Sequence, residues 1–404
     1  MISKMQLQYA LSNLWARKSR SFLTVFSIFI GITTIYLFIS FGLGLVGYVN
    51  AVAQEAGVGK FIVQPRGSGA PGMATSVVFD SRDVDTLLRV RGVQQVAAMS
   101  FSAVEVVQQQ ERVFVFGVGM PHDTQQRILA EESSTVSLDI GRDFRNNDRG
   151  KVILGANYAK ENGVFTRPLR VGDRLQVNNR TFDVIGFYTP IGNPTDDANI
   201  YMLMDDYEAL TGDVSYNMIV AQVDNPDVID EVVERAKHQL RRARNVREGQ
   251  EDFFIATFED LIAQFSAVIN IIVGFVVFIA LISVVVSAIN TANTMITSVL
   301  ERVKEIGIMK SIGATNQTVR NIYLLESSLL GLIAGILGTG LGMVLAHISG
   351  ILLESVGYGF LEPSQSIFLI LGCIVFATLV GTISGVFPAV YAAKQNPVDA
   401  LRYE

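Results

Sequence analysis

The hydrophobic positions of the chain gather into four long segments that contain no Lys, Arg, Asp or Glu. Each segment exceeds the roughly 20 apolar residues that an α-helix needs to cross a bilayer. Helices of a soluble protein normally carry charges on the face that meets water, so buried soluble helices explain four uncharged runs poorly. The pattern therefore predicts transmembrane helices at residues 21–54, 261–300, 327–353 and 363–393.

The composition agrees with a membrane protein. Half of the 404 residues are hydrophobic, and only 17% are charged. The first hydrophobic run is too long for a signal peptide, and no convincing cleavage site follows a short apolar core. We therefore expect residues 21–54 to remain in the protein as a membrane anchor.

Basic residues mark the short segments on one side of the predicted helices. Residues 1–20, 301–326 and 394–404 all carry Lys or Arg, whereas residues 354–362 carry none. Short basic segments stay in the cytoplasm. We therefore predict a protein of the cell membrane (the inner or plasma membrane) with both termini on its cytoplasmic side and residues 55–260 on its outer side. The N-terminal segment is expected either as a helix on the inner leaflet or as an extension of the first membrane helix.

The long segment between the first two predicted membrane helices reads as a folded, acidic α+β domain. Residues 55–260 contain 22 basic and 31 acidic residues, a balance that argues against nucleic acid as a partner. Short strand and helix patterns alternate along it, with a block at about residues 125–212 between two outer parts. We expect an extracytoplasmic domain of two subdomains, one inserted in the other.

Local patterns predict several elements of this domain. They include strands at residues 93–101, 103–109 and 112–119, and a hairpin of residues 174–177 and 181–187 that turns at two asparagines. Thr257 and Asp260 have the spacing of a capping box that opens the second membrane helix. Such a cap leaves no flexible linker between the domain and the membrane.

No cluster of residues in the sequence supports enzymatic chemistry. No glycine-rich loop ends in Gly-Lys-Ser or Gly-Lys-Thr, and the three histidines are far apart in sequence. Cys373, the one cysteine, lies inside the fourth membrane segment, where packing is its expected role. We therefore expect no catalytic, cofactor-binding or metal-binding residues in this chain.

The polar connection between the second and third membrane segments has an unusual pattern. Val299, Val303, Ile306 and Met309 fall on one face at helical spacing, and opposed charges surround them. Gly313 is placed to end this helix, and Thr315 or Asn316 to cap the next. These residues predict a short helix able to dock on another protein, although a solvated connector remains the alternative.

This connection resembles a known family. The sequence ERVKEIGIMKSIGAT from Glu301, followed by Glu326, is similar to the signature of the FtsX/MacB/LolC superfamily of ABC transporter permeases. The ending PVDALR from Pro397 resembles the Pro-x-x-Ala-Leu-Arg motif with which these permeases finish, and the four crossings match the family layout. The large outer domain, with Val171-Gly172-Asp173 before the sequence FDVIG, resembles the MacB-like and LolC-like members.

The resemblance implies a coupling helix seated on an ABC ATPase subunit. It implies two copies of this subunit, which carry ATP and Mg²⁺, and a second permease chain that forms a homodimer or heterodimer. Unlike MacB, the sequence has no fused ATPase domain, so a separate ATPase polypeptide is expected, and a membrane-fusion adaptor is a further candidate partner. The expected coupling residues are Glu301, Arg302, Lys304, Glu305, Ile306, Gly307, Lys310, Gly313 and Ala314.

Two functions remain open on this resemblance. The first is a permease that converts ATP-driven closure into movement of the outer domains and thereby exports or extracts a substrate, a mechanism known as mechanotransmission. The second is an FtsX-like signalling or scaffold protein, in which the same movement activates an outside partner such as a cell-wall hydrolase. In both, this chain is a non-catalytic subunit.

Glycines in the third and fourth membrane segments repeat at small-xxx-small spacing, which lets helices approach closely. Packing within one chain and packing across a dimer are both compatible with it. The pairs are Gly331 with Gly335, Gly338 with Gly342, and Gly381 with Gly385.

Overall fold

The computed structural model of the protein describes residues 18–56, 59–66, 77–212 and 215–396. The chain forms two compact units. A helical unit takes the described parts of residues 1–46, 268–352 and 361–404, and an α/β unit takes those of residues 47–267 and 353–360.

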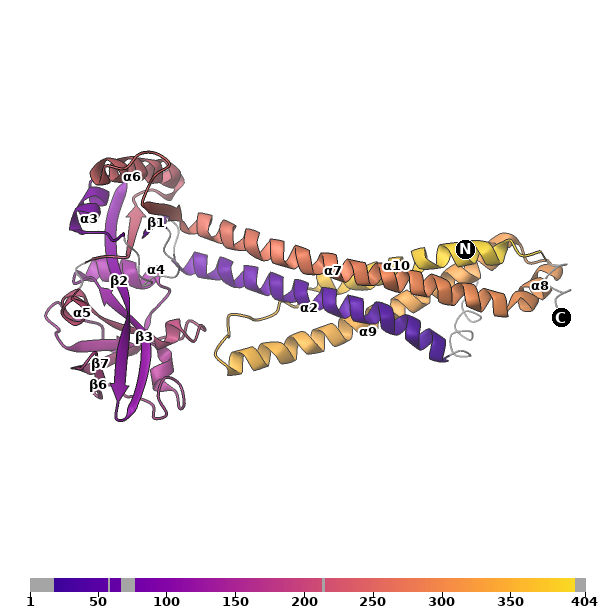
Figure 1. The fold of residues 1–404 in the computed structure, drawn as a ribbon, viewed down its shortest axis with the longest axis horizontal. Helices are drawn as coiled ribbons and strands as arrows, with labels where there is room; N and C mark the ends of the chain where they lie inside the picture. The colour runs from indigo at the N-terminus through magenta and orange to yellow at the C-terminus, as the bar shows by residue number, and fades with distance from the viewer. Residues whose placement is uncertain (1–17, 57–58, 67–76, 213–214, 397–404) are drawn as a thin grey trace. The chain divides into compact units, whose positions relative to one another are not determined.

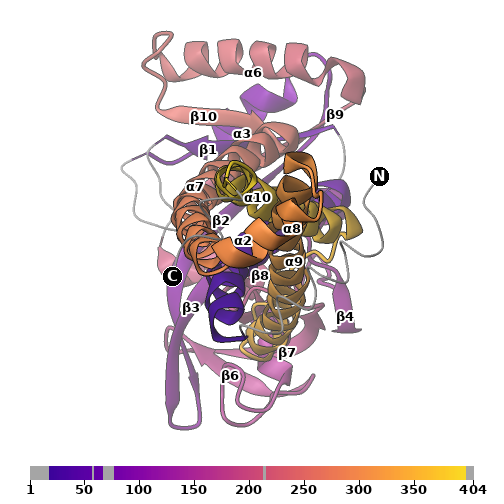
Figure 2. The same cartoon turned by 90° about the vertical axis from the view of Figure 1, so that its right-hand side faces the viewer.

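Four long helices confirm the predicted membrane-spanning architecture. Among the described residues, α2 (Lys18–Ala56), α7 (Phe258–Glu301), α9 (Asn316–Ser355) and α10 (Ile367–Ala393) are long and apolar enough to cross a bilayer. Within the helical unit these helices run alongside one another (Figures 1 and 2). Helix α9 begins well before its uncharged run, because Val319, Ile322 and Tyr323 supply a buried face in its polar first turns.

The helices of this unit pack through small and hydroxyl side chains as well as large apolar ones. Ile32 and Tyr36 of α2 are buried in one cluster with Ala334 of α9 and Ala377 of α10. The Thr33 hydroxyl donates a hydrogen bond of 3.0 Å to the carbonyl of Gly338, so α2 and α9 are in close contact. Hydrogen bonds of this kind add to close packing between helices where lipid weakens the hydrophobic driving force.

The α/β unit contains one long mixed sheet. Among the described residues, ten strands pair in the order β10-β1-β9-β2-β3-β8-β5-β7-β4, and β6 pairs with β2 and β7. Their bounds are β1 Lys60–Pro65, β2 Val93–Gln108, β3 Glu111–Met120, β4 Leu138–Gly141, β5 Lys151–Leu154, β6 Arg174–Val177, β7 Arg180–Tyr188, β8 Ile200–Leu203, β9 Met218–Val223 and β10 Phe253–Thr257.

Strand β2 joins the two halves of the sheet. It pairs with β9 through Val93–Met99 and with β3 through Ser100–Gln108. The prediction of separate strands at residues 93–101 and 103–109 was therefore wrong, because no glycine or proline interrupts the pattern between them and the 16 residues run as one strand. The predicted hairpin is confirmed by β6 and β7, with Asn178 and Asn179 at the positive φ that its turn needs.

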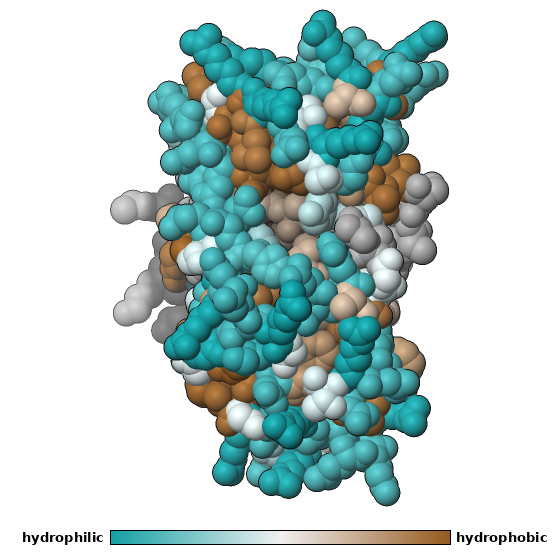
Figure 3. Space-filling model, turned by 90° about the vertical axis from the view of Figure 1, so that its left-hand side faces the viewer, coloured by the Kyte–Doolittle hydropathy of each residue, from teal (hydrophilic) through white to brown (hydrophobic). Residues whose placement is uncertain are grey.

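Helices cover the sheet at both ends. Helices α3 (Ser81–Leu88) and α6 (Ile229–Arg244) bury Leu87, Val232 and Leu240 in a core with β1, β9 and β10, and α6 lies along β10 in Figure 2. The second half carries α4 (Thr124–Ser133), α5 (Met204–Thr211) and the short 3-10 turns η1 (Ala156–Ala159) and η2 (Asp196–Ala198). A third 3-10 turn, η3 (Pro226–Val228), directly precedes α6 in the first half. Hydrophilic side chains cover most of the face shown in Figure 3, and hydrophobic ones form separate patches.

The junction between β10 and α7 carries the capping box that the sequence predicted. The Thr257 amide donates to the Asp260 carboxylate and the Asp260 amide to the Thr257 hydroxyl, both at 3.0 Å. These reciprocal bonds form a capping box, and α7 starts directly after the strand. Phe258 and Leu261 of its first turn pack against the core of the α/β unit.

A buried ion-pair network stabilises the second half of the sheet and depends on pH. Asp148 is buried and accepts hydrogen bonds of 2.6 Å from both Arg142 and Lys151. The Arg142 hydrogen bonds, chiefly, hold the pKa of the Asp148 carboxyl well below its ordinary value. Because the folded pKa is lowered, the stabilisation is complete above the ordinary pKa of about 3.9 and is lost as the pH falls towards the folded value.

We expect Asp148→Asn to lower the local unfolding free energy by about 1–3 kcal/mol at pH 7. The difference from wild type should narrow below about pH 4, where the Asp148 carboxyl is protonated in the unfolded state but still ionised in the folded state. Hydrogen exchange of the residue 142–151 amides in the full chain, corrected for the intrinsic rate at each pH, measures both effects. Asp183→Asn is the matched control, since its half-exposed pair with Arg174 should contribute less than about 1 kcal/mol; equal effects of the two variants would contradict the prediction.

Candidate functional site

The predicted docking element is an ordered helical elbow between α7 and α9. Helix α8 (Val303–Ser311) follows α7 after a single residue, Arg302. Gly313 has a φ of +105°, its amide donates to the Lys310 carbonyl, and the Ala314 amide donates to the Met309 carbonyl. These two bonds and the positive φ form a Schellman motif, so Gly313 ends α8 as predicted.

The next helix is capped at the predicted position. Thr315 lies immediately before α9, and Thr318 lies in its first turn. The Thr318 amide donates a hydrogen bond of 3.2 Å to the Thr315 hydroxyl. Of the two predicted caps, Thr315 is the one that acts. Two defined helix ends within five residues fix the path of the chain through the elbow.

One face of α8 is buried against the helical unit. Val299 and Ile306 are fully buried in a cluster with Val319, Tyr323 and Ala389, and Met309 packs against it. The elbow is therefore attached to α9 and α10 by apolar contacts.

Lys310 fastens the elbow to the end of α10. Its ammonium group donates hydrogen bonds of 2.7 Å to the backbone carbonyls of Ala393 and Gln395. The last carbonyls of a helix lack intrahelical partners and carry partial negative charge, which a lysine satisfies well. Lys310 was predicted to contact an ATPase, and the structure gives it this intrachain role.

Other predicted coupling residues divide by exposure. Glu301, Lys304, Glu305 and Gly313 are exposed, Ala314 is partly exposed, and Ile306 and Gly307 are buried. Arg302 is only 5% exposed at the start of α8. The exposed residues form the charged part of a surface, whereas the buried ones fix the geometry of the helix beneath it.

Two exposed isoleucines complete this surface, and the sequence reasoning did not select them. Ile308 is 46% exposed, and Ile312, just beyond the helix, is 82% exposed. Their spacing of four residues places both away from the buried Ile306, and this signal was readable in the sequence. We call Glu301, Lys304, Glu305, Ile308 and Ile312 the elbow surface. Apolar anchors beside charged groups are typical of a protein-docking surface.

The six predicted packing glycines lie at contacts between helices of this chain. A Cβ atom on Gly331 would lie 2.5 Å from the carbonyl oxygen of Ala377, and a Cβ atom on Gly381 would lie 2.6 Å from the carbonyl oxygen of Ser327. These two glycines, together with Gly335 and Gly385, therefore lie where α9 contacts α10. Gly338 and Gly342 similarly face Phe29, Ile32 and Tyr36 of α2.

Some predicted features lie outside the described residues. These are residues 1–17 of the N-terminal segment and the motif Pro397–Arg402. Across residues 18–56, 59–66, 77–212 and 215–396, no group of three or more His, Cys, Asp or Glu side chains is arranged to hold a metal ion.

Two family models match the sequence. The model of the MacB-like periplasmic core domain matches residues 21–239, and that of the FtsX-like permease C-terminal region matches residues 277–397. Together they span both units. The matched regions include the elbow and all six packing glycines.

Curated relatives match over nearly the whole chain. An uncharacterized ABC transporter permease of Methanocaldococcus jannaschii is 33% identical over 400 residues, which cover 98% of each chain. The uncharacterized ABC transporter permease YknZ of Bacillus subtilis is 28% identical, again over 98% of each. The macrolide export ATP-binding/permease protein MacB of Chlorobium luteolum is 27% identical over 98% of this chain and 60% of its own length.

Two solved structures match about half of the chain at low identity. The extracellular domain of YknZ from Gram-positive bacteria is 16% identical with a TM-score of 0.39, covering 49% of this chain and 100% of that one. The periplasmic region of MacB from Actinobacillus actinomycetemcomitans is 16% identical with a TM-score of 0.41, covering 52% and 94%.

Proposed function

This chain belongs to the MacB-like and FtsX-like family of ABC transporter permeases, and from that premise we propose that it couples ATP hydrolysis in a partner ATPase to movement of its α/β unit. The movement exports or extracts a substrate by mechanotransmission. The chain itself is non-catalytic and binds no cofactor, and ATP and Mg²⁺ are held by the ATPase.

The observation that carries the proposal is the elbow surface. It presents Ile308 and Ile312 beside Glu301, Lys304 and Glu305, on a helix whose other face is packed against α9 and α10. An ATPase groove that takes this surface would therefore pull on the ends of three membrane helices together. We place the elbow, with both chain termini, on the cytoplasmic side of the cell membrane, where its basic residues favour it.

The route from the elbow to the α/β unit is α7. This helix is continuous from Phe258 to Glu301, and its capping box joins it directly to strand β10. It contains no proline, the commonest cause of a sharp kink in a helix. We propose that α7 carries the ATPase movement to the α/β unit on the other side of the membrane.

The proposed assembly contains two ATPase subunits and two permease chains. Large apolar side chains remain exposed along α7, among them Ile271, Phe275 and Phe278. In a membrane these side chains can face lipid or a second permease chain without contact with water. A dimer gives each ATPase its own elbow surface, so paired closure of the ATPases moves both α/β units.

The test is co-purification of an ATPase with the tagged chain from native membranes. Glu305→Ala removes an exposed charge of the elbow surface, and Gly313→Leu forces a side chain into left-handed backbone, which costs about 1–2 kcal/mol and distorts the elbow. We expect either variant to reduce the recovered ATPase, or its activity per complex, by about tenfold. Gly249→Leu, at a positive φ with open space around it, is the matched control and should behave as wild type. Recovery of no ATPase with the wild-type chain would contradict the proposal.

A further inference from the structure

Strand β3 has an edge that is only partly paired. On one side it pairs with β2 from Glu111 to Gly119. On the other side it pairs with β8 only through Gly117–Met120. Among the described residues, no strand pairs with this second edge between Glu111 and Phe116. About six residues of backbone, roughly 20 Å of extended chain, therefore have one row of hydrogen-bonding groups without a strand partner.

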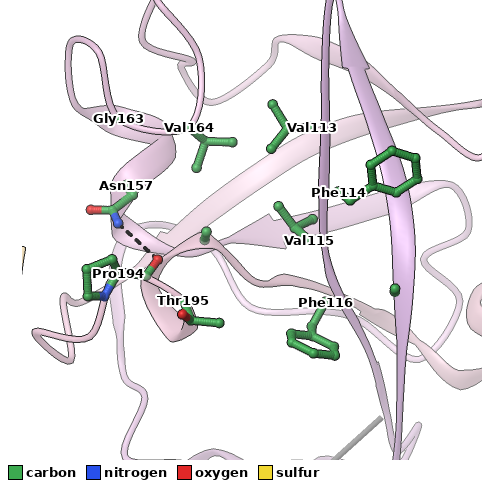
Figure 4. Close-up of a pocket in the computed structure, with 11 residues that line it drawn as sticks. Val113, Phe114, Val115, Phe116, Asn157, Gly163, Val164, Pro194 and Thr195 are labelled. Atoms are coloured by element: carbon green, nitrogen blue, oxygen red, sulfur yellow. Dashed lines mark hydrogen bonds between the residues drawn. The ribbon is translucent and has the colours of Figure 1, made fainter. Parts of the chain in front are cut away.

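A cavity of about 450 Å³ lies alongside this edge. Four consecutive residues, Val113 to Phe116, line one wall, and Val164, Pro194 and Ala198 lie across from them. Successive side chains of a strand point to opposite faces of the sheet, so a cavity lined by four in a row reaches round the open edge of the strand. On one face it extends as far as Ala103 of β2. Figure 4 shows Val164, Pro194 and Thr195 opposite the β3 side chains.

The walls of the cavity are uncharged. Its polar groups are few, and the Asn157 amide already donates to the Pro194 carbonyl at 3.3 Å. Phe114 on the edge strand is 75% exposed, which leaves a large aromatic surface in water. An occupant that covered this ring and filled the cavity with apolar side chains would remove that surface from water.

We propose that the open edge of β3 binds an extended peptide segment of a partner protein, which adds a strand beside Glu111–Phe116. Main-chain hydrogen bonds to the edge provide affinity, and alternate apolar side chains of the segment enter the cavity. The part of the segment beside Val113–Phe116 is uncharged, because the cavity walls offer no charged group to pair with. An open strand edge normally invites uncontrolled pairing, so a dedicated partner also explains why this one is left without a strand. The inference concerns the α/β unit and does not depend on the ATPase proposal.

The test uses the full chain in lipid nanodiscs and a fluorescent peptide of alternating valine and threonine as the probe. Its matched control carries N-methyl groups on alternate amides, which keep the side chains but remove the donors of one edge. Because the backbone supplies most of the affinity, this sequence should bind with a Kd below about 1 mM, and the N-methylated peptide at least about tenfold more weakly. Fluorescence anisotropy measures both.

Two variants locate the site. Phe114→Lys should weaken the binding by about tenfold without harming the fold, since the ring is exposed. Phe254→Lys changes an exposed phenylalanine of β10, the strand at one end of the sheet, and should leave binding unchanged. Absence of saturable binding, equal binding of the N-methylated peptide, or dependence on Phe254 in place of Phe114 would each overturn the proposal. Self-association of the chain that Phe114→Lys abolishes, without peptide binding, would assign the edge to a second copy and also overturn it.

Recovery of the ATPase by Phe114→Lys is measured in the same preparations. The peptide site and the elbow surface are separate, so this variant should co-purify with the ATPase as the wild type does. A loss of peptide binding with normal ATPase recovery therefore supports the β3 site alone. The two proposals can fail independently.

Discussion

Gly331→Leu is expected to prevent stable association of α9 with α10. A Cβ atom at Gly331 would meet only backbone: the Ala377 oxygen at 2.5 Å, the Gly381 Cα at 3.1 Å and the Thr378 Cα at 3.2 Å. Backbone atoms of a neighbouring helix cannot rotate away as a side chain does, so the helices must separate. Overpacking of this kind costs about 1–3 kcal/mol or more, and separation also removes the buried contacts of Ala334 and Ala377.

Cys373 provides the measurement. It is the chain's one cysteine and is buried in the same helical cluster, so a fluorogenic maleimide reacts with it when the helices separate. We expect Gly331→Leu to lower the midpoint of thermal unfolding by about 4 °C or more in detergent, or to abolish the transition. Gly340→Leu on the same helix is the control, since no atom lies within 4 Å of its Cβ position. Equal midpoints for the two variants would show that the α9–α10 contact is not as close as the structure has it.

The membrane architecture could be predicted because its signal is local and strong. A run of more than about 20 residues without a charge has few explanations other than a membrane helix. The glycine spacing likewise identified positions of close approach, but sequence alone left open whether the partner helix belongs to the same chain. The structure resolves this for Gly331 and Gly342, which face α10 and α2 of their own chain.

The order of the sheet could not be predicted in the same way. Strand β1 pairs with β9 and β10, which follow it by well over a hundred residues, and no local pattern encodes such a pairing. The division of β2 into two strands failed for a related reason. Its two halves pair with different neighbours, β9 and β3, and no local pattern shows that one strand serves both.

The elbow was predictable in outline and not in detail. Helical periodicity correctly assigned Val299 and Ile306 to the buried face and Glu305 to the exposed one. The same periodicity cannot reveal that Lys310 reaches carbonyls more than eighty residues later in the chain, at Ala393 and Gln395. Residues of one charged, amphipathic segment therefore separate into a docking surface and an internal fastening only once the tertiary structure is known.

The largest functional effect is expected from Ile312→Asp. Ile312 is 82% exposed at one end of the elbow surface, where the proposed docking partner would bury it. Burial of such a side chain contributes about 1.5–3 kcal/mol, and an aspartate in the same apolar position adds the desolvation of a charge. We therefore expect ATPase binding to weaken by at least about a hundredfold, and ATP-driven transport to be lost with it.

Affinity is measured between the purified chain in nanodiscs and its ATPase at several concentrations, so that a weakened complex is distinguished from an absent one. Ile128→Asp is the matched control. It makes the same chemical change away from the elbow, at an exposed isoleucine on helix α4 of the α/β unit. The thermal protection of Cys373 should be the same in both variants, since neither side chain belongs to the helical core. Equal affinity of Ile312→Asp and Ile128→Asp for the ATPase would contradict this prediction. The ATPase would then bind the charged residues Lys304 and Glu305 alone, and the apolar part of the elbow surface would have no role in coupling.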